Sequence, residues 1–469
     1  MHLHRHVDRL RVFLLIPICG FLYCVSKPYE KKPASEIYPL LISDNHRFFK
    51  TKNGDPFFWM GDTGWLLFTN LNDEETKIYL DDRKKKGFNV IQVMLLHGLS
   101  DKNIYGRYAL INSNLSQPDI NNNDAHNYWK RIDNIIDLAA KKGMYIAMVP
   151  VWGNVIKSGK VSEIQAKSYA SFLALRYKNK PNIIWMNGGD IKGSDSLNIW
   201  NIIGETLHKE DPNHLITFHP RGRAISSLWF QNADWMSFNV FQSGHRRYDQ
   251  DTSADDLHYG EDNYKYVQAA YNLKPIKPVL DAEPSYENIP QGLHDTSQPK
   301  WKAADVRRYA YWSVFAGACG FTYGNNSIMQ FHNGADKPGA YGATKDWRKA
   351  LNDSGALQMI YLKNLMHRND YFSRIPDQSV VVDQGEKYKY IAVTRSNAYL
   401  LAYDYTGRKF SLNLENIKVK SVVASWYNPR NGSKTAIGKI LSNGIVNFNP
   451  PGEEKNGNDW VLILDYIKS

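Results

Sequence analysis

Eight short apolar runs, separated by stretches with helical periodicity, constrain the fold of this chain more than any other feature. Each run has the length of a buried strand. The eight runs are Phe57–Trp59, Val90–Leu95, Met144–Pro150, Ile183–Met186, His214–His219, Trp235–Asn239, Val279–Ala282 and Gly320–Tyr323. Eight strands alternating with helices predict an α/β fold and favour a (β/α)₈ TIM barrel.

The clearest helical stretch is Tyr128–Lys142, which places Ile132, Ile135, Ile136 and Ala139 on one face. Further helices are predicted at Glu74–Lys86, from an N-cap at Ser162 to about Lys178, at Ser196–Lys209 and at Lys302–Ala318. An open doubly wound sheet shows the same alternation of strands and helices. The phosphate-binding patterns typical of such sheets, G-x-G-x-x-G and G-x-x-x-x-G-K-[ST], are absent from the sequence.

From about Ile375 the pattern changes to short strand-like runs between turn residues. The runs are Ser379–Val382, Tyr390–Thr394, Tyr399–Tyr403, Phe410–Leu414, Ser421–Tyr427, Ile445–Phe448 and Trp460–Leu464. This spacing predicts a small antiparallel β-sandwich. We therefore assign residues 27–374 to the barrel and residues 375–469 to a C-terminal sandwich domain.

The N-terminus has the order of a secretory leader. Arg5, Arg9 and Arg11 precede an apolar run of 14 residues, Val12–Val25, which suits a signal peptide better than a bilayer span. Residues 1–26 are therefore predicted to be a signal peptide. The mature protein is expected outside the cytoplasm, in the periplasm, at the cell surface or secreted.

The three cysteines, Cys19, Cys24 and Cys319, bear on the compartment. Lipidation of Cys24 as a membrane anchor is the alternative to cleavage, but the bulky Tyr23 before it argues against this signal. Cleavage after Ser26 leaves only Cys319, so the mature chain forms no internal disulfide.

The formal net charge is +11, from 58 basic and 47 acidic residues. The densest basic run in the body, Arg83 to Lys86, follows Asp81 and Asp82 and ends a predicted helix, where cations complement the helix dipole. The excess charge is therefore dispersed, and we expect no nucleic-acid partner.

A carboxylate follows each of two predicted strands. Asp190 follows the fourth run through Asn187-Gly188-Gly189, and Glu283 follows the seventh. Active sites of (β/α)₈ barrels lie at the carboxyl ends of the strands, so the two acids can face each other across one mouth. Two carboxylates that flank one bond are what glycoside hydrolysis requires.

Each acid also has a structural alternative, since Asp190 can cap a turn and Glu283 can form a salt bridge. Asp62, Asp234, Asp281 and Glu287 are rival carboxylates. Neither H-E-x-x-H nor G-x-S-x-G occurs, which argues against metallohydrolase and serine hydrolase chemistry. We expect no metal and no cofactor.

Several segments together carry a family resemblance: residues 58–65 (FWMGDTGW), 86–92 (KGFNVIQ), 187–190 (NGGD), 241–245 (FQSGH) and 281–284 (DAEP). They resemble the apiosidase-like glycoside hydrolases, glycoside hydrolase family 140. Residues 426–432 (WYNPRNG) are similar to the domain usually fused to that family and named for collagen binding. The resemblance covers nearly all of the mature chain.

This resemblance implies a (β/α)₈ catalytic domain in which Asp190 matches the acid/base and Glu283 the nucleophile. Most relatives in the wider clan carry Glu at the fourth strand, and Asp is shorter by one methylene. A retaining mechanism follows if the two carboxyl groups are about 5 Å apart, whereas more than about 6.5 Å favours inversion. Relatives suggest release of a branched pentose from a pectin side chain of the plant cell wall.

Other residues near strand ends are predicted to contact the sugar, because flat rings cover its C–H faces and polar side chains bind its hydroxyls. They are Asp62, Trp65, His97, Trp152, His219, Asn239, Gln242, His245 and Tyr323. The 13 Trp, 29 Tyr and 19 Phe residues fit a protein that binds sugar rings.

Two other functions compete with this prediction. The chain could be a non-catalytic carbohydrate-binding or adhesion protein on a barrel scaffold, or a collagen-binding or collagenolytic protein. The two carboxylates argue against the first, and the absence of a protease constellation argues against the second. We expect a monomer that meets a membrane only if Cys24 is lipidated, with the C-terminal domain packed on the barrel.

Overall fold

The computed structural model describes residues 37–120, 123–252, 259–334 and 337–467. The predicted signal peptide, with Cys19 and Cys24, lies outside the described residues, so export, cleavage and lipidation stay predictions. Within the described residues, no helix is both long and apolar enough to cross a membrane. Cys319 is buried and carries a free thiol.

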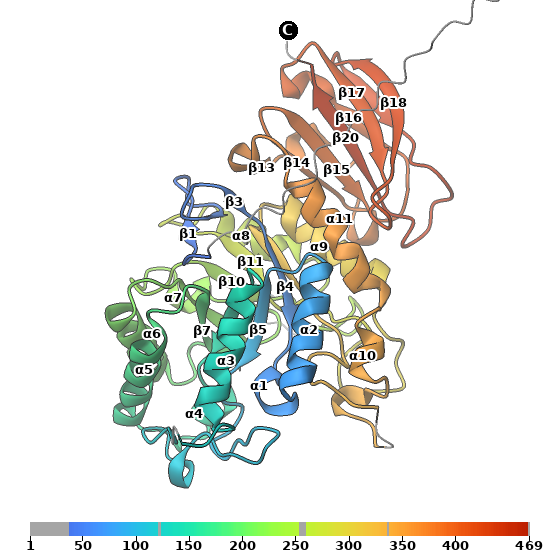
Figure 1. Cartoon of the computed structure of the whole chain (residues 1–469). Coiled ribbons are helices and arrows are strands. Elements are labelled where there is room, and N and C mark those ends of the chain that lie inside the picture. Colours follow the sequence, from blue (N-terminus) through green and yellow to red (C-terminus); the bar gives the residue numbers. More distant parts are fainter. Residues whose placement is uncertain (1–36, 121–122, 253–258, 335–336, 468–469) are drawn as a thin grey trace, which may run out of the picture. The chain divides into compact units, whose positions relative to one another are not determined.

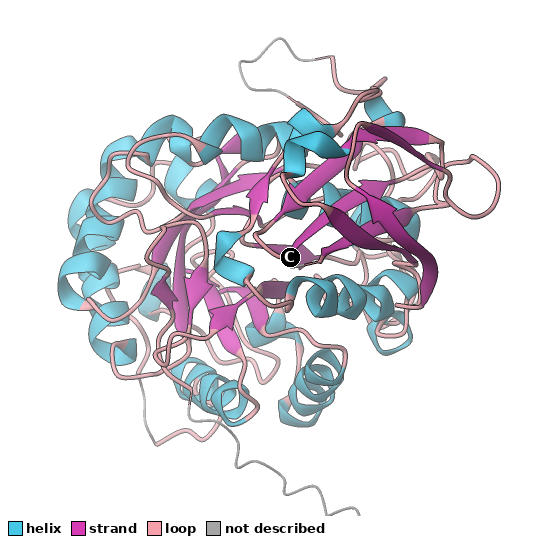
Figure 2. Ribbon diagram, turned by 90° about the horizontal axis from the view of Figure 1, so that it is seen from above, coloured by secondary structure: helices cyan, strands magenta, loops and turns pink. Residues whose placement is uncertain are grey.

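Eight parallel strands form a nearly closed barrel with helices around it, which confirms the predicted fold class (Figures 1 and 2). The strands are β4 (Trp59–Thr63), β5 (Val90–Met94), β6 (Tyr145–Val149), β7 (Ile183–Ile191), β8 (Ile216–Pro220), β10 (Asn239–Gln242), β11 (Val279–Asp281) and β12 (Gly320–Tyr323). They pair in the order β8-β7-β6-β5-β4-β12-β11-β10, and the short β9 (Ala224–Ile225) joins β10 antiparallel. Among the described residues of these eight strands, only Asp190 is exposed.

The barrel closes between β8 and β10 through contacts at the amino end of β10. The Ser237 amide donates to the Ile216 carbonyl at 2.8 Å, and the Ile216 amide donates to Ser237 Oγ at 3.0 Å. Thr217 Oγ1 donates to the Phe238 carbonyl at 2.6 Å. The side chains of Ser237 and Thr217 thus replace part of the backbone hydrogen bonding between β8 and β10. The buried amide of Ile216 and the carbonyl of Phe238 therefore still have hydrogen-bond partners.

Helices cover the outer face of the barrel (Figure 2). The longer ones are α2 (Asp73–Lys85), α3 (Tyr128–Lys141), α5 (Glu163–Tyr177), α6 (Leu197–Glu210), α8 (Tyr264–Tyr271), α9 (Ala303–Phe315) and α11 (Ser354–Met366). Shorter ones are α1 (Leu67–Asn70), α4 (Gly153–Lys157), α7 (Ser227–Phe230) and α10 (Trp347–Ala350). The 3₁₀ turns are η1 (Ile111–Ser113), η2 (Ala340–Gly342), η3 (Tyr371–Ser373), η4 (Gln378–Val380), η5 (Lys387–Lys389) and η6 (Leu414–Ile417).

Two helix predictions are confirmed in detail. Ser162 caps α5, since its side chain accepts from the Gln165 amide while the Gln165 side chain accepts from the Ser162 amide. Helix α3 buries Ile132, Ile135 and the other apolar residues of its predicted face. Local capping and apolar periodicity therefore agree with the tertiary packing of both helices.

Two predicted strands are displaced by several residues. Instead of the predicted Phe57–Trp59, Pro56–Phe57 forms β3 of a small antiparallel sheet, with β1 (Leu41–Ile42) and β2 (Phe49–Lys50), and β4 begins at Trp59. The predicted Trp235–Asn239 ends where β10 begins, because Trp235 and Met236 pack in the core before the strand. Both errors arise because a buried apolar loop has the same sequence pattern as a buried strand. With the observed bounds, Asp62 lies inside β4 and Gln242 inside β10.

The C-terminal region contains a six-stranded antiparallel sheet and a two-stranded sheet. The first has the order β13 (Ile375–Pro376), β14 (Ile391–Arg395), β15 (Tyr399–Asp404), β20 (Trp460–Tyr466), β17 (Ser421–Tyr427) and β18 (Lys434–Leu441), and the second pairs β16 (Phe410–Asn413) with β19 (Ile445–Phe448). The predicted strand Ser379–Val382 is wrong, because Gln378–Val380 forms η4. Strand β18 was not predicted, because it is an edge strand without a buried residue.

The C-terminal region packs against α9. Arg307 of this helix donates from Nε and Nη2 to the two carboxylate oxygens of Asp459, at 2.8 and 2.7 Å, and both side chains are buried. Residues 36–469 form one compact unit. The proposed boundary at residue 374 therefore stays a prediction.

Candidate active site

A cavity of about 780 Å³ opens at the carboxyl ends of the barrel strands. Seven of the eleven residues predicted for the site line it: Asp190, Glu283, Trp65, His97, Trp152, Gln242 and His245. The fold therefore brings together the two acids, which are far apart in sequence. Within the described residues, no group of three His, Cys, Asp or Glu side chains could hold a metal ion.

Asp190 reaches the cavity through an irregularity of β7. Gly188 pairs with His219 of β8, but the next pair is Ile191 with Pro220, so β7 holds two residues that face no partner. Such a bulge re-aims a side chain next to an active site. Asp190 itself has a φ of 47°, a conformation that the surrounding structure must hold in place.

Glycine is required at both positions before Asp190. Gly188 and Gly189 have φ values of 92° and 109°. A Cβ at Gly188 would lie 2.7 Å from a ring carbon of Phe218, and a Cβ at Gly189 would lie 2.6 Å from a ring carbon of Trp152. The turn therefore needs both the conformational freedom and the small volume of glycine.

We expect Gly189→Ala to lower the free energy of unfolding by about 2–4 kcal/mol, because it adds overpacking against Trp152 to an unfavourable φ. It should also lower kcat by displacing Asp190. Gly54→Ala is the matched control, since Gly54 has a φ of 86° and a Cβ added there would have no neighbour within 4 Å. The control should cost only about 1 kcal/mol and leave kcat unchanged. Thermal melting and kcat measure both effects, and equal losses in the two variants would contradict the role of the bulge.

Glu283 lies between two histidines. His219 Nε2 is 3.2 Å from Glu283 Oε2, and His245 Nε2 is 3.4 Å from Glu283 Oε1. Burial raises the pKa of Glu283, but the hydrogen bonds and charges of the two histidines outweigh it and lower the pKa to about 2. The Gly244 amide also donates to the Glu283 carbonyl at 3.3 Å, which fixes the backbone.

Asp190 shows the opposite shift. Its side chain is exposed to the cavity, yet the protein around the cavity desolvates the carboxyl group and raises its pKa to about 6. The negative charge of Glu283 adds to the rise, whereas His219 and a 3.3 Å hydrogen bond from the Gly222 amide oppose it. Two carboxyl groups whose environments separate their pKa values suit an acid and a nucleophile.

Asp281 has a different environment from Glu283, although it is only two positions earlier. Its side chain is fully buried and accepts from Asn263 Nδ2 at 2.9 Å and from Ser243 Oγ at 3.2 Å. Burial raises the pKa of Asp281 to about 8 in spite of these hydrogen bonds. Its carboxyl group is therefore largely neutral at pH 7 and is unsuited to nucleophilic attack.

The other rival carboxylates lie away from the cavity. Asp62 is buried in β4, where Tyr79 donates to it at 2.6 Å and Arg83 lies 3.5 Å away. Glu287 accepts from the Tyr323 hydroxyl at 2.6 Å and from the Gly355 amide. The remaining rival, Asp234, follows α7, is exposed and lines a separate outer groove.

Four residues predicted to contact the sugar do not line the cavity. His219 lies beneath it against Glu283, and Asp62 and Tyr323 bond within the scaffold as described above. Asn239 Nδ2 donates to Gln231 Oε1 at 2.9 Å in the barrel wall. All four side chains are fully buried, so their role in this structure is to support the site.

An aromatic cluster forms one wall of the site. The rings of Trp65 and Trp152 are 5.4 Å apart, and each lies within 6.2 Å of the His219 ring. Trp65 Nε1 donates to the Tyr286 hydroxyl at 3.2 Å. These contacts leave Trp152 half-buried at the cavity, where a ring can cover a sugar face.

Five basic side chains in the lining were not predicted from the sequence: Lys157, Lys192, Arg221, Arg223 and Arg246. Burial lowers the pKa of Arg223, the positive charges of Arg246 and Arg221 lower it further, and the charge of Asp251 opposes the shift. Arg223 is 3.3 Å from Asp251 and Lys157 is 3.1 Å from Asp195. The arginines come from segments next to strand ends, not from one basic run, which is why a search for charge runs misses them.

Comparison with protein families agrees with this geometry. A family model described as "Apiosidase-like, catalytic domain" matches residues 43–373. The chain belongs to the apiosidase-like glycoside hydrolases. Residues 375–465 of this apiosidase-like protein match a second model, described as "Putative collagen-binding domain of a collagenase".

Solved structures support the same family. One named "Glycoside hydrolase" is 47% identical to this apiosidase-like chain, with a TM-score of 0.88, and the match covers 92% of this chain and 98% of the other. A glycoside hydrolase family 5 protein from Bacteroides vulgatus ATCC 8482 is 44% identical, with a TM-score of 0.88 and coverage of 91% and 94%. Among curated proteins, none matches the chain.

This apiosidase-like protein is therefore an enzyme that hydrolyses glycosidic bonds in a carbohydrate substrate, on a TIM-barrel fold. Its family and its two cavity carboxylates both argue against a non-catalytic binding protein on the same scaffold.

Proposed function

We propose that this protein is an exported, retaining glycoside hydrolase with Glu283 as nucleophile and Asp190 as acid/base. The observation that carries the proposal is the pair of opposite shifts in one cavity, a pKa of about 2 for Glu283 and about 6 for Asp190. At mildly acidic pH one carboxyl group is ionised and the other still holds a proton. This is the combination that double displacement needs.

The reaction has two steps. A carboxylate oxygen of Glu283 bonds to the anomeric carbon, while the glycosidic C–O bond breaks and Asp190 gives its proton to the departing oxygen. Asp190, now ionised, takes a proton from water. The water oxygen then attacks the anomeric carbon, displaces Glu283 and restores both side chains.

The pKa shifts predict the pH dependence of kcat/KM. Glu283 must be ionised, so activity falls as the pH drops toward about 2. Asp190 must be protonated, so activity falls as the pH rises through about 6. We expect a broad optimum between these limits, measured as initial rates at low substrate concentration. Maximal activity that persists above pH 8 would contradict the assignment of Asp190.

For the substrate, we propose a pectin side chain of the plant cell wall, from which the enzyme releases a branched pentose. The family description supports an apiose-type sugar. The basic lining, with Arg221, Arg223 and Arg246 in the same cavity as Asp190, supports a substrate that carries carboxylates. Export, from the basic and apolar leader, would bring the enzyme to a polysaccharide outside the cytoplasm.

The test is a screen of purified protein on defined plant polysaccharide fragments, with released monosaccharides identified by chromatography. Neutral hemicellulose fragments and carboxyl-reduced pectin fragments form the control arms. Release of a pentose from native pectin fragments, with the product first appearing in the substrate's anomeric configuration by NMR, is the expected result. Release only from neutral glycans would reject the pectin proposal, and inversion of the anomeric centre would reject the role of Glu283 as nucleophile.

A further inference from the structure

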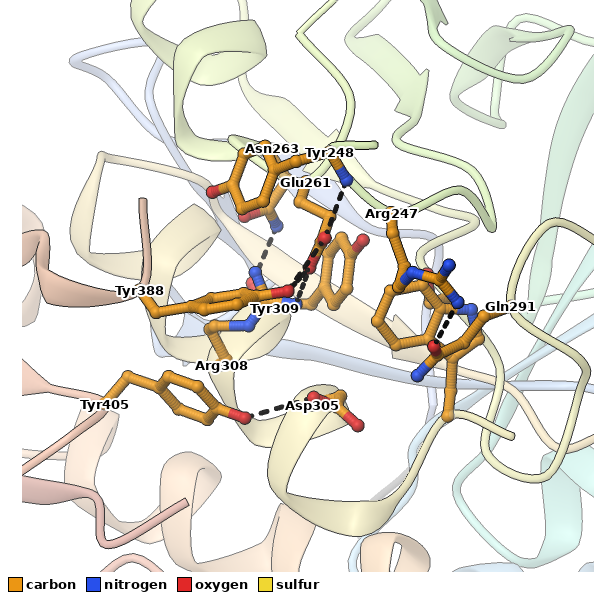
Figure 3. Close-up of polar contacts among 12 residues, drawn as sticks. Arg247, Tyr248, Glu261, Asn263, Gln291, Asp305, Arg308, Tyr309, Tyr388 and Tyr405 are labelled. Atoms are coloured by element: carbon orange, nitrogen blue, oxygen red, sulfur yellow. Dashed lines mark hydrogen bonds and ion pairs between the residues drawn. The ribbon is translucent and has the colours of Figure 1, made fainter. Parts of the chain in front are cut away.

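A tyrosine of the C-terminal domain reaches a buried carboxylate of the barrel (Figure 3). The Tyr388 hydroxyl, on η5, donates to the two oxygens of Glu261 at 3.0 and 3.1 Å. Glu261 is fully buried and forms an ion pair with Arg308 of α9. A hydroxyl from one domain thus completes the coordination of a charge buried in the other.

Aromatic rings enclose this ion pair. The Arg308 guanidinium lies 4.9 Å from the ring centres of Tyr388 and Trp312, and 5.3 Å from that of Tyr405. Arg308 is fully buried, so its charge is balanced by Glu261 and by the ring faces. A buried pair of this kind is sensitive to the loss of any one partner.

From Glu261, one path leads to His245 through a single hydrogen bond and a short stretch of backbone. Glu261 Oε1 accepts from the Tyr248 amide at 3.0 Å, three residues after His245. The His245 carbonyl accepts from Trp301 Nε1 at 3.1 Å. The segment from His245 to Tyr248 is thus fixed by Trp301 at one end and by Glu261 at the other, and it places His245 against Glu283.

A second path leads to the strand that precedes Glu283. Asn263, two positions after Glu261, donates from Nδ2 to Asp281 at 2.9 Å and to the Tyr309 carbonyl at 2.8 Å. Asp281 is the last residue of β11 and lies two positions before Glu283. One path therefore begins at Glu261 and the other at Asn263, two residues along the chain, and both end next to the same catalytic carboxylate.

We propose that Tyr388 is a positioning residue for the hydrolytic reaction: through Glu261, the C-terminal domain fixes the two segments that hold Glu283. This inference rests on the proposed function, since it takes Glu283 as the nucleophile. It gives the C-terminal domain a role in turnover that its match to a collagen-binding description does not contain.

Tyr405 provides a matched control within the same interface. Its hydroxyl donates to Asp305 at 3.1 Å, in the first turn of α9, and its ring also faces Arg308. Tyr405→Phe and Tyr388→Phe each remove one hydroxyl that bonds to a carboxylate of the barrel, and each keeps the ring. Only the Tyr388 hydroxyl bonds to the carboxylate that anchors both segments.

The experiment compares the two full-length variants with wild type. Tyr388→Phe should lower kcat roughly 5- to 20-fold, because only part of the energy of one hydrogen bond to a charged group reaches Glu283 through the two segments, with KM changed less than about twofold. Its acid limb should move to higher pH, because His245 then lowers the pKa of Glu283 less. The other groups that interact electrostatically with Glu283 are present in both variants: His219, Asp190, Asp281, Tyr286 and Tyr341. Tyr405→Phe should keep kcat within about twofold of wild type and leave the acid limb unchanged.

Amide hydrogen exchange gives a readout that needs no turnover. Peptides that span residues 243–250 should exchange faster in Tyr388→Phe than in Tyr405→Phe or wild type. Unchanged kcat in Tyr388→Phe, or equal changes of kcat and acid limb in both variants, would overturn the positioning role. If wild type cleaves no glycan, the proposed function fails, and the exchange of this segment alone decides whether Tyr388 positions it.

Discussion

Glu283→Gln is expected to lower kcat by about 10⁴-fold or more, the largest effect predicted for any single substitution in this protein. The amide cannot form the glycosyl ester, because its oxygen is a poor nucleophile and its nitrogen is not nucleophilic. Gln has nearly the same shape, so substrate should still bind. Steady-state rates measure the loss. Tryptophan fluorescence measures binding, since Trp65 and Trp152 line the cavity.

Asp234→Asn is the control for this substitution. It makes the same carboxyl-to-amide change at an exposed residue in the outer groove, so kcat and binding should equal those of wild type. The decisive contrary result is a Glu283→Gln protein that folds, binds the glycan and turns it over at more than a hundredth of the wild-type rate. The nucleophile would then have to be another carboxylate.

Asp190→Asn is expected to lower kcat on natural glycans by about 10³-fold, because the departing oxygen no longer receives a proton and water is no longer activated. The first step should recover on an aryl glycoside whose phenol leaves without protonation. The glycosyl-enzyme then accumulates, and azide, which needs no general base, should restore turnover and give a glycosyl azide of retained configuration. The rate, the azide dependence and the product configuration are all measurable.

The same variant should also lose the basic limb of the pH profile, since the group with a pKa of about 6 is absent. Wild type, which has its own general base, should gain nothing from azide and serves as the control. A variant that azide does not rescue, on a substrate with a good leaving group, would show that Asp190 supports the structure and does not transfer protons.

Much of the barrel could be predicted because its strands are buried on both faces and read as apolar runs between amphipathic helices. The bounds of β12, β17 and β19 match the prediction. Strand β18 could not be found in this way, since its residues face solvent and its place is set by pairing with β17. Apolar periodicity in the sequence reveals buried strands, whereas β18 is exposed and is stabilised by its hydrogen bonds to β17.

The two acids could be predicted because both follow apolar runs, and barrel topology then brings them to one mouth. The two histidines against Glu283 were predicted as sugar ligands. Their contact with the carboxylate depends on the distance between β8, β10 and β11, which sequence spacing does not contain. The bulge before Asp190 likewise requires the register of β7 against β8.

In this enzyme, the bulge of β7 and the length of the side chain at position 190 together set where the acid lies. Aspartate is one methylene shorter than glutamate, and it reaches the cavity from the two unpaired residues of β7. A glutamate at position 190 on the present backbone would extend its carboxyl group by one methylene. The length of the side chain at position 190 and the number of unpaired residues at the end of β7 are therefore coupled, since a change in either one alone shifts the carboxyl group relative to Glu283.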